Sequence, residues 1–511
     1  MNALRQLLKP LVTLLALVML AAPAAGLTAT TESPEIAIPD DAIRVCTSGC
    51  PYSTIEAALE AATDGETIAV IGGEYSGPLV IDKSVHLIGI DQPVIDGHDS
   101  GTVVRINVPD VTLQGFTIQH SGSNFDKEDS AVYIDAEGAR ILDNRMLNTL
   151  FGVNAATAHN SVISGNYILG KDVEMGIRGD GIKIWYSHDV EIANNEIERS
   201  RDLLVWYSNN AVVRDNYVHD GRYGFHFMNS DDGLAEHNRI VDNSVAIYLM
   251  YGKRFVIRDN LLQGSRGPSG HGLGLKEIDG VEVEGNIIYD NRIGVFIDNS
   301  PLSPTVYSHF RHNLIAYNDQ GFGVLPSSRN NVLTDNSMID NLEQVAILGA
   351  GKLGDNQWSL DGRGNFWSDY AGYDADGDGV GDIPFRSEQL SEQVMDSWPI
   401  LQLYRFSVAE AAVDFGSRAV PMFQQEPKLI DEHPLISPVI PENAPKPVSP
   451  DRSTHTTVGS IVLLAAAGGA IWWAVRGTRF TIPSSVSRPR GWTPNGASLQ
   501  SGNEQFMESH Q

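Results

Sequence analysis

The fold of this chain is indicated by the stretch GRYGFHFM at residues 221–228 and by its counterpart AIYLM at residues 246–250. In the first stretch the phenylalanines alternate with His226 and Met228, so the two kinds of side chain point to opposite sides of an extended backbone. A period of two is typical of β-strands that have one face in a core. We therefore interpret the two stretches as corresponding strands of a repeated unit.

The repeated unit runs through most of the chain. It has the form polar or small residue, asparagine, any residue, aliphatic residue, and its asparagines are Asn144, Asn166, Asn195, Asn216, Asn238, Asn260, Asn286, Asn313 and Asn336. A period of about 22 residues, with short strands and no helices between them, predicts a coiled β-solenoid. An asparagine at one fixed turn position can adopt the left-handed conformation and bond its equivalent in the next coil, which would give an internal ladder. We predict an all-β protein in which residues 53–400 form a right-handed parallel β-helix.

Counting from these asparagines assigns the side chains of the second strand in each coil. The strand starts eight residues after the asparagine, and the next and third-next residues point to the core. This rule places Leu204 and Trp206 inside. It places the following residues outside: Lys183, Trp185, Val205, Tyr207, His226, Met228, Tyr248, Met250, Gly274, Lys276, Phe296 and Asp298.

The outward residues predict a binding surface. Equivalent residues of successive coils stack about 4.8 Å apart, so Trp185, Tyr207, Met228 and Met250 are expected to form a column. Exposed aromatic and thioether side chains in one patch mark interaction sites. The alternative is that a loop or the C-terminal segment covers this face and turns it into a second small core.

Three of the outward residues could hold copper. His226 and Met228 lie on the same side of one strand, and Met250 would lie one coil above Met228. Imidazole and thioether groups are ligands that suit Cu(I). The rival interpretation is that these residues contact another protein, because interfaces also favour methionine and aromatic residues.

Catalysis on acidic polysaccharides is the alternative function. Hydrolysis of a glycosidic bond needs two carboxylates that flank one cleft, and the outward face offers Asp298 alone. Elimination needs a base and a group that neutralises the substrate carboxylate, for which Arg222 and Lys276 are the candidates. The aromatic and thioether character of the face favours a protein that is not an enzyme, with a polysaccharide lyase or epimerase as the alternative.

The N-terminal region predicts export. Residues 1–25 combine basic residues, an apolar run and small residues in the order of a signal peptide. In the following segment, residues 26–52, Cys46 and Cys50 are expected to form a disulfide, and a metal pair is the alternative. From Ser53 onward a short amphipathic helix is expected, capped by Ser53 with Glu56 completing a capping box. This helix would cover the open end of the solenoid.

An acidic turn at residues 374–382 resembles a calcium loop. Asp374, Asp376, Asp378 and Asp382 occupy positions 1, 3, 5 and 9, with glycine at position 6 and the Val380 backbone at position 7. Position 12 is Phe385 instead of the usual glutamate. The sequence predicts a weak structural calcium site, with a solvated acidic turn as the alternative.

The C-terminal region predicts a membrane anchor. Residues 401–455 are expected to form an extended proline-rich linker, and residues 456–476 an apolar transmembrane helix. Arginines follow this helix, so the positive-inside rule places the tail, residues 477–511, in the cytoplasm and the solenoid on the periplasmic side. The formal net charge of −28 argues against binding to nucleic acid.

At several of these stretches the chain resembles NosD-type proteins, which are periplasmic β-helix accessory factors of nitrous oxide reductase maturation. The resemblance covers roughly residues 54–386. It depends on RYGFHFM at 222–228, YLMY at 248–251, GLGLK at 272–276, GNFWSDY at 364–370 and the acidic turn. Two features depart from the family pattern: the linker with its anchor, and Asn229, which stands where an aromatic residue is expected.

This resemblance implies a role in assembling the copper–sulfide centre of nitrous oxide reductase, together with the ATPase and permease of an ABC transporter. It implies copper at His226, Met228 and Met250. A paralogue that serves a related metalloenzyme is the alternative. The residues expected to contact partners are Trp185, Tyr207, Arg222, Tyr223, Tyr248, Lys276, Phe296 and Asp298.

Overall fold

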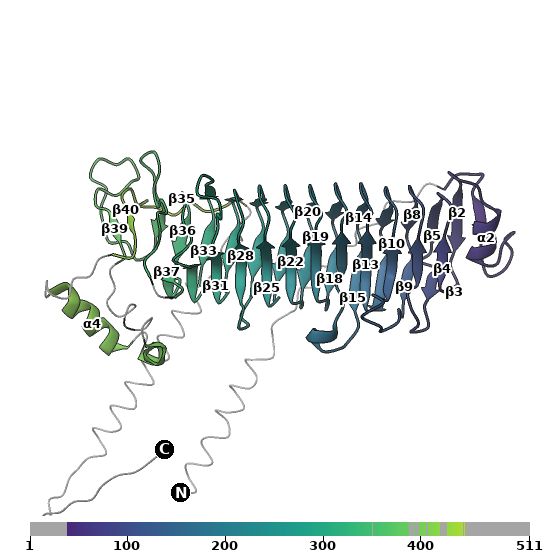
Figure 1. Cartoon of the computed structure of the whole chain (residues 1–511), viewed down its shortest axis with the longest axis horizontal. Helices are drawn as coiled ribbons and strands as arrows, with labels where there is room; N and C mark the ends of the chain where they lie inside the picture. Colours follow the sequence, from purple (N-terminus) through teal and green to yellow (C-terminus); the bar gives the residue numbers. More distant parts are fainter. Residues whose placement is uncertain are drawn as a thin grey trace, which may run out of the picture. The chain divides into compact units, whose positions relative to one another are not determined.

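The computed structural model describes residues 38–349, 351–387, 394, 398–404, 407–419, 427–442 and 444. Each coil contributes one short strand to each of three sheets, and every pairing between coils is parallel (Figure 1). The predicted parallel β-helix is therefore confirmed.

Sheet 1 has 13 strands, in the order β1 (Ile43–Val45), β2 (Thr67–Ile71), β5 (His86–Ile90), β8 (Thr112–Gln114), β11 (Arg140–Leu142), β14 (Val162–Ser164), β17 (Glu191–Ala193), β20 (Val212–Arg214), β23 (Leu234–Glu236), β26 (Val256–Arg258), β29 (Glu282–Glu284), β32 (Ser308–Arg311) and β35 (Asn331–Thr334). Sheet 2 also has 13 strands, in the order β3 (Glu74–Ser76), β6 (Val94–Asp96), β9 (Thr117–Gln119), β12 (Arg145–Thr149), β15 (Tyr167–Gly170), β18 (Glu196–Glu198), β21 (Tyr217–His219), β24 (Arg239–Val241), β27 (Leu261–Gln263), β30 (Ile287–Tyr289), β33 (Leu314–Ala316), β36 (Ser337–Ile339) and β38 (Phe366–Trp367).

Sheet 3 has 12 strands and carries the predicted binding surface. Its strands are β4 (Leu79–Ile81), β7 (Val104–Ile106), β10 (Ser130–Ile134), β13 (Phe151–Ala156), β16 (Ile182–Trp185), β19 (Asp202–Trp206), β22 (Tyr223–Met228), β25 (Val245–Met250), β28 (His271–Lys276), β31 (Ile293–Asp298), β34 (Gln320–Val324) and β37 (Glu343–Ile347). The inward residues of adjacent coils, such as Phe227 and Leu249, are buried and stack along the axis of the solenoid.

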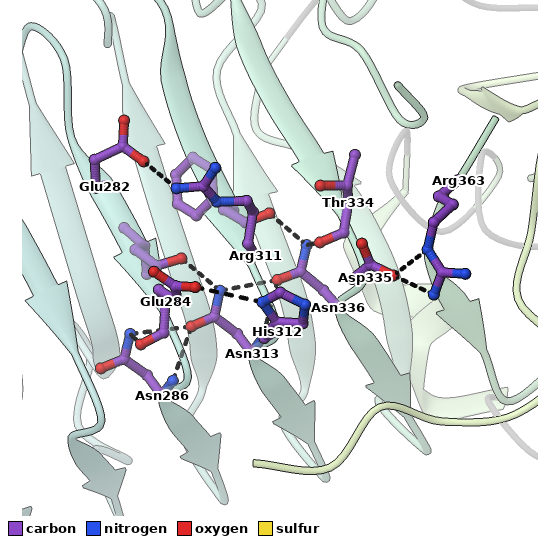
Figure 2. Close-up of polar contacts among 12 residues, drawn as sticks. Glu282, Glu284, Asn286, Arg311, His312, Asn313, Thr334, Asp335, Asn336 and Arg363 are labelled. Atoms are coloured by element: carbon purple, nitrogen blue, oxygen red, sulfur yellow. Dashed lines mark hydrogen bonds and ion pairs between the residues drawn. The ribbon is translucent and has the colours of Figure 1, made fainter. Parts of the chain in front are cut away.

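The predicted asparagine ladder is present and buried. The Nδ2 of Asn286 donates to Oδ1 of Asn313 at 3.0 Å, and Asn313 donates in the same way to Asn336 at 2.8 Å (Figure 2). Each backbone N–H of the ladder bonds the same oxygen, as Asn286 N does at 3.0 Å. Each amide thus finds an acceptor in the next coil and donors in the preceding one, so its burial leaves no polar group unsatisfied.

The left-handed conformation lies one residue earlier than predicted. It is adopted by the residue before the asparagine, as at Asp215 (φ 55°), His237 (φ 55°) and Asp335 (φ 56°). This arrangement turns the corner at the small or polar residue of the repeat. The asparagine itself then enters sheet 2 with its side chain directed inward.

Charged side chains accompany the ladder on the outside of the same corner. Arg311 bonds Glu282 at 2.9 Å, and His312 lies 3.4 Å from Glu284, each joining two successive coils (Figure 2). These pairs are exposed, so they contribute little to stability compared with the buried amides.

The N-terminal end of the solenoid is covered by helix α2 (Ile55–Ala61), as predicted, but its cap differs. Thr54, not Ser53, is the N-cap: its backbone is extended and its hydroxyl accepts a hydrogen bond from Ala57 N at 3.3 Å. The helix therefore begins one residue later than the capping-box pattern suggests. Cys46 and Cys50 form a disulfide next to it.

The C-terminal end is sealed by strand β40 (Ile430–Asp431), which pairs antiparallel with β39 (Phe385–Arg386). The ladder continues through Asn365, and the Asp431 carboxylate accepts hydrogen bonds from Asn365 N at 2.8 Å and from Trp367 Nε1 at 2.9 Å. Asp431 thus takes the place of the next asparagine oxygen. Burial raises the pKa of this carboxyl group, and the hydrogen bonds that it accepts oppose the shift.

The remaining predicted segments are described only in part. The signal peptide at 1–25, the transmembrane helix at 456–476 and the tail at 477–511 lie outside the described residues. None of the helices in the described part of the chain has the length and apolar character needed to cross a bilayer. The predicted extended linker, 401–455, differs from the structure, since it holds helix α4 (Val408–Ala419) and β40, and the short helix η2 (Pro399–Tyr404) overlaps its start.

The ladder yields a test of stability. Asn238 is buried, and its Nδ2 donates to Asn260 Oδ1 at 2.9 Å and to Val213 O at 2.8 Å. We expect Asn238→Ala to lower the free energy of unfolding by about 3 kcal/mol, because buried donors and acceptors in two coils lose their partners. Denaturant unfolding measures the loss.

The matched control is Asn107→Ala, at an exposed asparagine. We expect this change to lie within about 0.5 kcal/mol of the wild type. Equal effects of the two substitutions would contradict a structural role for the ladder.

Candidate functional site

The outward face of sheet 3 consists of three columns of residues in register from coil to coil. The first column is Asp202, Tyr223, Val245, His271 and Ile293. The second column is Lys183, Leu204, His226, Tyr248, Gly274 and Phe296. The third column is Trp185, Trp206, Met228, Met250, Lys276 and Asp298.

One position of the predicted column is wrong. Trp206, not Tyr207, pairs with Trp185 and Met228, and Leu204 lies on the outward face while Val205 is fully buried. The register shifts between Asp202 and Leu203, because β22 carries one residue more, Gly224, than β19 does. A count of eight residues from the asparagine is therefore one too many in this coil, and a slip of one residue exchanges the two faces of a strand.

His226 lies at the centre of the face, between a carboxylate and a sulfur. Its Nε2 lies 3.4 Å from Sδ of Met250, one coil further on. Its Nδ1 lies 3.2 Å from Oδ2 of Asp202, one coil back. His226 is 8% exposed and both methionines are partly exposed, so the candidate ligand residues lie near the surface. The structure thus brings together His226 and Met250, with Met228 paired to Met250 in the third column.

Buried acid–arginine pairs border the site. Arg222 Nε donates to Asp202 at 2.9 Å, and Arg201 donates to Asp180 through two nitrogens at 2.9 and 3.1 Å. Burial raises the pKa of Asp180 to about 7, with a contribution from the Asp202 charge. Burial acts in the same direction on Asp202, but hydrogen bonds with His226 and Arg222 outweigh it and hold the pKa of Asp202 below its usual value. Asp202 therefore remains an anion beside the imidazole.

Two aromatic rings flank His226, Tyr223 on its own strand and Tyr248 on the next. Tyr223 contacts it edge-on at 4.9 Å between ring centroids. Tyr248 lies over Gly274, where an added Cβ would come within 2.1 Å of its ring. Burial, with a contribution from the Asp298 charge, raises the pKa of Tyr248 to about 12.

Farther along the face, His271 stacks on Phe296 at 4.4 Å between ring centroids. Burial and the charge of Arg292 lower its pKa to about 4, so His271 is neutral. Phe296, which was predicted to contact a partner, thus packs against a histidine.

The exposed aromatic residues gather at the corner after sheet 3. Trp185, Tyr186, Tyr207 and Tyr251 are each 36–45% exposed, and the rings of Tyr186 and Tyr207 stack at 4.9 Å. The three tyrosines have positive φ, as do Asn229 and Glu277 at the same corner of other coils, so this conformation belongs to the repeat. Sequence reasoning found Trp185 and Tyr207 but missed Tyr186 and Tyr251, which follow the last outward residue of their strands.

Among the residues that the structure describes, ion pairs with other segments lie at the two ends of the face. At one end Glu128 pairs with Lys183 and accepts a hydrogen bond from Asn154 Nδ2 at 2.7 Å. At the other end Lys428 pairs with Glu343. Between these ends, in the described part of the chain, Trp185 and Tyr251 are each 39% exposed.

The residues considered for catalysis are not gathered at one point. Lys276 and Asp298 are neighbours in the third column, but Arg222 precedes β22, which is three coils or about 14 Å away from β31. Arg222 is also paired with Asp202. The hydrogen bond with Tyr251 raises the pKa of Lys276, so this lysine is a cation and not a base.

The acidic turn holds three carboxylates close together. One oxygen from each of Asp374, Asp376 and Asp378 lies within 4.8 Å of the others. Backbone N–H groups also bond this turn: Gly379 N donates to Asp374 at 2.9 Å, and Ala375 N donates to Asp382 at 2.7 Å.

Phe385, at position 12 of the loop, is buried and stacks on Trp367 at 4.5 Å. The ring belongs to the end of the solenoid, so this position supplies no bidentate carboxylate. The loop fits a weak calcium site of oxygen ligands.

For this loop we expect Ca²⁺ at millimolar concentration to raise the melting temperature of the protein by about 2 °C or more, because an ion that binds only the folded state stabilises it. The double variant Asp374→Asn/Asp378→Asn is expected to lose this response, whereas Asp361→Asn, at an exposed acid outside the loop, retains it. Calorimetry with and without Ca²⁺ provides the measurement. An unchanged melting temperature of the wild type would leave the loop a solvated acidic turn.

The protein is a parallel β-solenoid with a histidine–methionine pair on one outward face. Residues 169–372 match the family model described as "Periplasmic copper-binding protein (NosD)". Two relatives carry the name "Probable ABC transporter binding protein NosD". The one from Stutzerimonas stutzeri is 28% identical over 71% of this chain and 85% of its own length. The one from Pseudomonas aeruginosa is 26% identical over 76% of this chain and 92% of its own length.

The chain is therefore similar to proteins named NosD over most of its length, and to the NosD family model over residues 169–372. Its matched region contains the whole central part of sheet 3, from β16 to β34. Among solved structures, the A-module of the mannuronan C-5 epimerase AlgE6 from Azotobacter vinelandii resembles 59% of this chain and 91% of its own length, at 15% identity and a TM-score of 0.49.

Proposed function

We propose that this protein is a periplasmic, non-enzymatic copper-binding accessory protein. The observation that carries the proposal is the approach of His226 Nε2 and Met250 Sδ to 3.4 Å on neighbouring strands. Bonds from a transition metal to nitrogen and sulfur are about 2.0–2.3 Å long, so one ion can contact both atoms. Met228, beside Met250 in the third column, is the further ligand.

The chemistry of these donors favours Cu(I). Thioether sulfur and neutral imidazole are soft or intermediate ligands without charge, which suit a soft monovalent ion better than Cu²⁺, Mg²⁺ or Ca²⁺. The carboxylate nearest to the site, Asp202, is directed to the other nitrogen of His226 and is paired with Arg222. The site would bind the ion without reducing or oxidising a substrate.

Rigid strands supply all three ligands, and this suits storage and transfer of an ion. His226 and Met228 come from β22 and Met250 from β25. Partial exposure of the methionines leaves one side of the site open to a partner that carries or receives copper. The surrounding aromatic rings exclude water and so limit loss of the ion to solvent.

The names of the relatives support the choice of partners. They connect NosD with an ABC transporter, and the family description gives the periplasm and copper. We propose that this chain works with an ABC transporter ATPase and permease, and that it docks nitrous oxide reductase or a related metalloenzyme during assembly of its copper–sulfide centre. A C-terminal helix at 456–476 would hold it at the periplasmic face of the inner membrane, with the calcium loop as a structural element.

Copper binding is tested by anaerobic Cu(I) competition titration of the full-length protein. Met228→Leu/Met250→Leu is expected to weaken binding at least about 100-fold, since a loss of roughly 1.4 kcal/mol for each sulfur gives a factor of ten each. His226→Gln is expected to have an effect of similar size.

The matched control is Met146→Leu/Met338→Leu, which changes two methionines that are fully buried in the core. This variant is expected to bind Cu(I) like the wild type. Equal Cu(I) binding by the wild type and by Met228→Leu/Met250→Leu would place copper elsewhere and contradict the proposed site.

Docking is tested at the exposed corner. Tyr251→Ala is expected to weaken binding to purified partner enzyme by about 1–2 kcal/mol, because exposed tyrosines at interfaces carry much of the binding energy. The control is Tyr317→Ala, which changes a tyrosine with the same positive φ and 58% exposure on the corner after sheet 2. Surface plasmon resonance distinguishes the two variants, and equal affinities would remove the corner from the interface.

A further inference from the structure

The copper proposal leaves a carboxylate beside the site without a role. Asp202 is 1% exposed, and its Oδ2 lies 3.2 Å from His226 Nδ1 while its Oδ1 accepts a hydrogen bond from Arg222 Nε at 2.9 Å. Asp202 precedes His226 by one coil and stands in the first column, so it approaches the imidazole from the side opposite to Met250.

His226 has one acceptor beside each ring nitrogen: the Asp202 carboxylate at Nδ1 and the Met250 sulfur at Nε2. An ionised carboxylate only accepts hydrogen bonds, so a contact between Asp202 and Nδ1 requires that Nδ1 carries the proton. The neutral ring has one proton, so when Nδ1 carries it, Nε2 faces Sδ of Met250 with its lone pair.

We infer that Asp202 is a positioning residue that fixes His226 as the Nδ1-protonated tautomer and directs the Nε2 lone pair at the position shared with Met250. This inference rests on the proposed copper site for its purpose, but the tautomer is a property of the metal-free protein. A carboxylate that orients a metal-binding histidine through its second nitrogen also raises the basicity of the ligand.

Arg222 keeps this carboxylate in place. It donates to both oxygens of Asp202 and stacks over the ring of Tyr223, with 4.4 Å between the guanidinium carbon and the ring centroid. The Asp202 side chain therefore has its orientation set by a group other than the histidine, and the imidazole adopts the ring position that this carboxylate allows.

The coil before this one provides an internal comparison. Asp180 is fully buried and bonds Arg201 in the same bidentate manner. The residue in register with His226 in the next coil back is Leu204, so the pair of Asp180 and Arg201 exists without a histidine. The acid–arginine pair thus belongs to the solenoid, and the contact with an imidazole is a separate feature of Asp202.

The test uses full-length protein with ¹⁵N-labelled histidine rings, free of metal, and long-range ¹H–¹⁵N spectra that distinguish protonated from unprotonated ring nitrogens. Signals of His226 are identified by their loss in His226→Gln. We expect the wild type to show protonated Nδ1 and unprotonated Nε2. In Asp202→Asn the amide can donate to Nδ1, so we expect the Nε2-protonated tautomer to become populated.

Cu(I) competition on the same samples gives the second readout. Asp202→Asn is expected to weaken binding about 10- to 100-fold, while the matched control Asp180→Asn keeps both the tautomer and the affinity of the wild type. Asp202→Asn/Arg222→Gln removes the guanidinium charge that the single variant leaves unpaired, and it is expected to show the same tautomer change with a native circular dichroism spectrum.

A wild type with protonated Nε2, or an Asp202→Asn variant with unchanged tautomer and affinity, would overturn the inference. Equal tautomer changes in the Asp180→Asn control would also overturn it, because the effect would then arise from any buried charge nearby. If the tautomer behaves as expected but the wild type binds no Cu(I), the positioning role stands and the proposed copper function fails.

Discussion

The register between coils is the constraint on which the rest of the molecule depends, and buried amide groups set it. Each ladder asparagine bonds the next through both its backbone N–H and its Nδ2, as Asn238 does with Asn260. A coil that slipped by one residue would lose these bonds and also turn its apolar side chains outward. Ligand atoms that come from separate coils can meet at a defined distance only because this register is fixed.

The residues of the candidate site come from three successive coils and from a different column in each coil. His226 lies in the second column, Asp202 in the first column one coil back, and Met250 in the third column one coil further on. Three successive coils, about 4.8 Å apart along the axis, thus supply a carboxylate, an imidazole and a thioether. The local insertion of Gly224 makes room for the first column, because it adds a residue at the start of β22 where Tyr223 pairs with Asp202.

Much of the fold could be predicted because it follows from a simple period. The repeat, the inward apolar positions and the ladder can each be predicted from residue type and spacing. The errors arose where one residue changed the count. Trp206 and Tyr207 exchanged roles because β19 lacks the counterpart of Gly224, and Thr54 replaced Ser53 because the choice between adjacent hydroxyl caps depends on backbone angles.

In the candidate site, the outward positions of His226, Met228 and Met250 could be predicted by counting residues along the strands. Asp202 could not be found in this way, because its contact crosses both a column and a coil, although the Arg201-Asp202 and Arg222 spacing could have indicated a pair in successive coils.

The hydrogen bonds that join one ladder asparagine to the next all run in one direction along the solenoid axis. The group at the end of the ladder therefore determines whether another strand can pair with it. In the ladder each asparagine backbone N–H donates toward the C-terminal coil, whereas the Nδ2 of the last one, Asn365, donates to Leu333 O and Trp358 O. An asparagine N–H at the end would still offer a donor to an incoming strand. Here the final acceptor is the carboxylate of Asp431, which when ionised has no proton to pass on. Strand β40, which carries it, runs antiparallel to β39 and breaks the parallel pattern. The carboxylate and the antiparallel strand thus interrupt the ladder at its C-terminal end, and an interrupted edge opposes the end-to-end pairing by which open β-stacks assemble into fibrils.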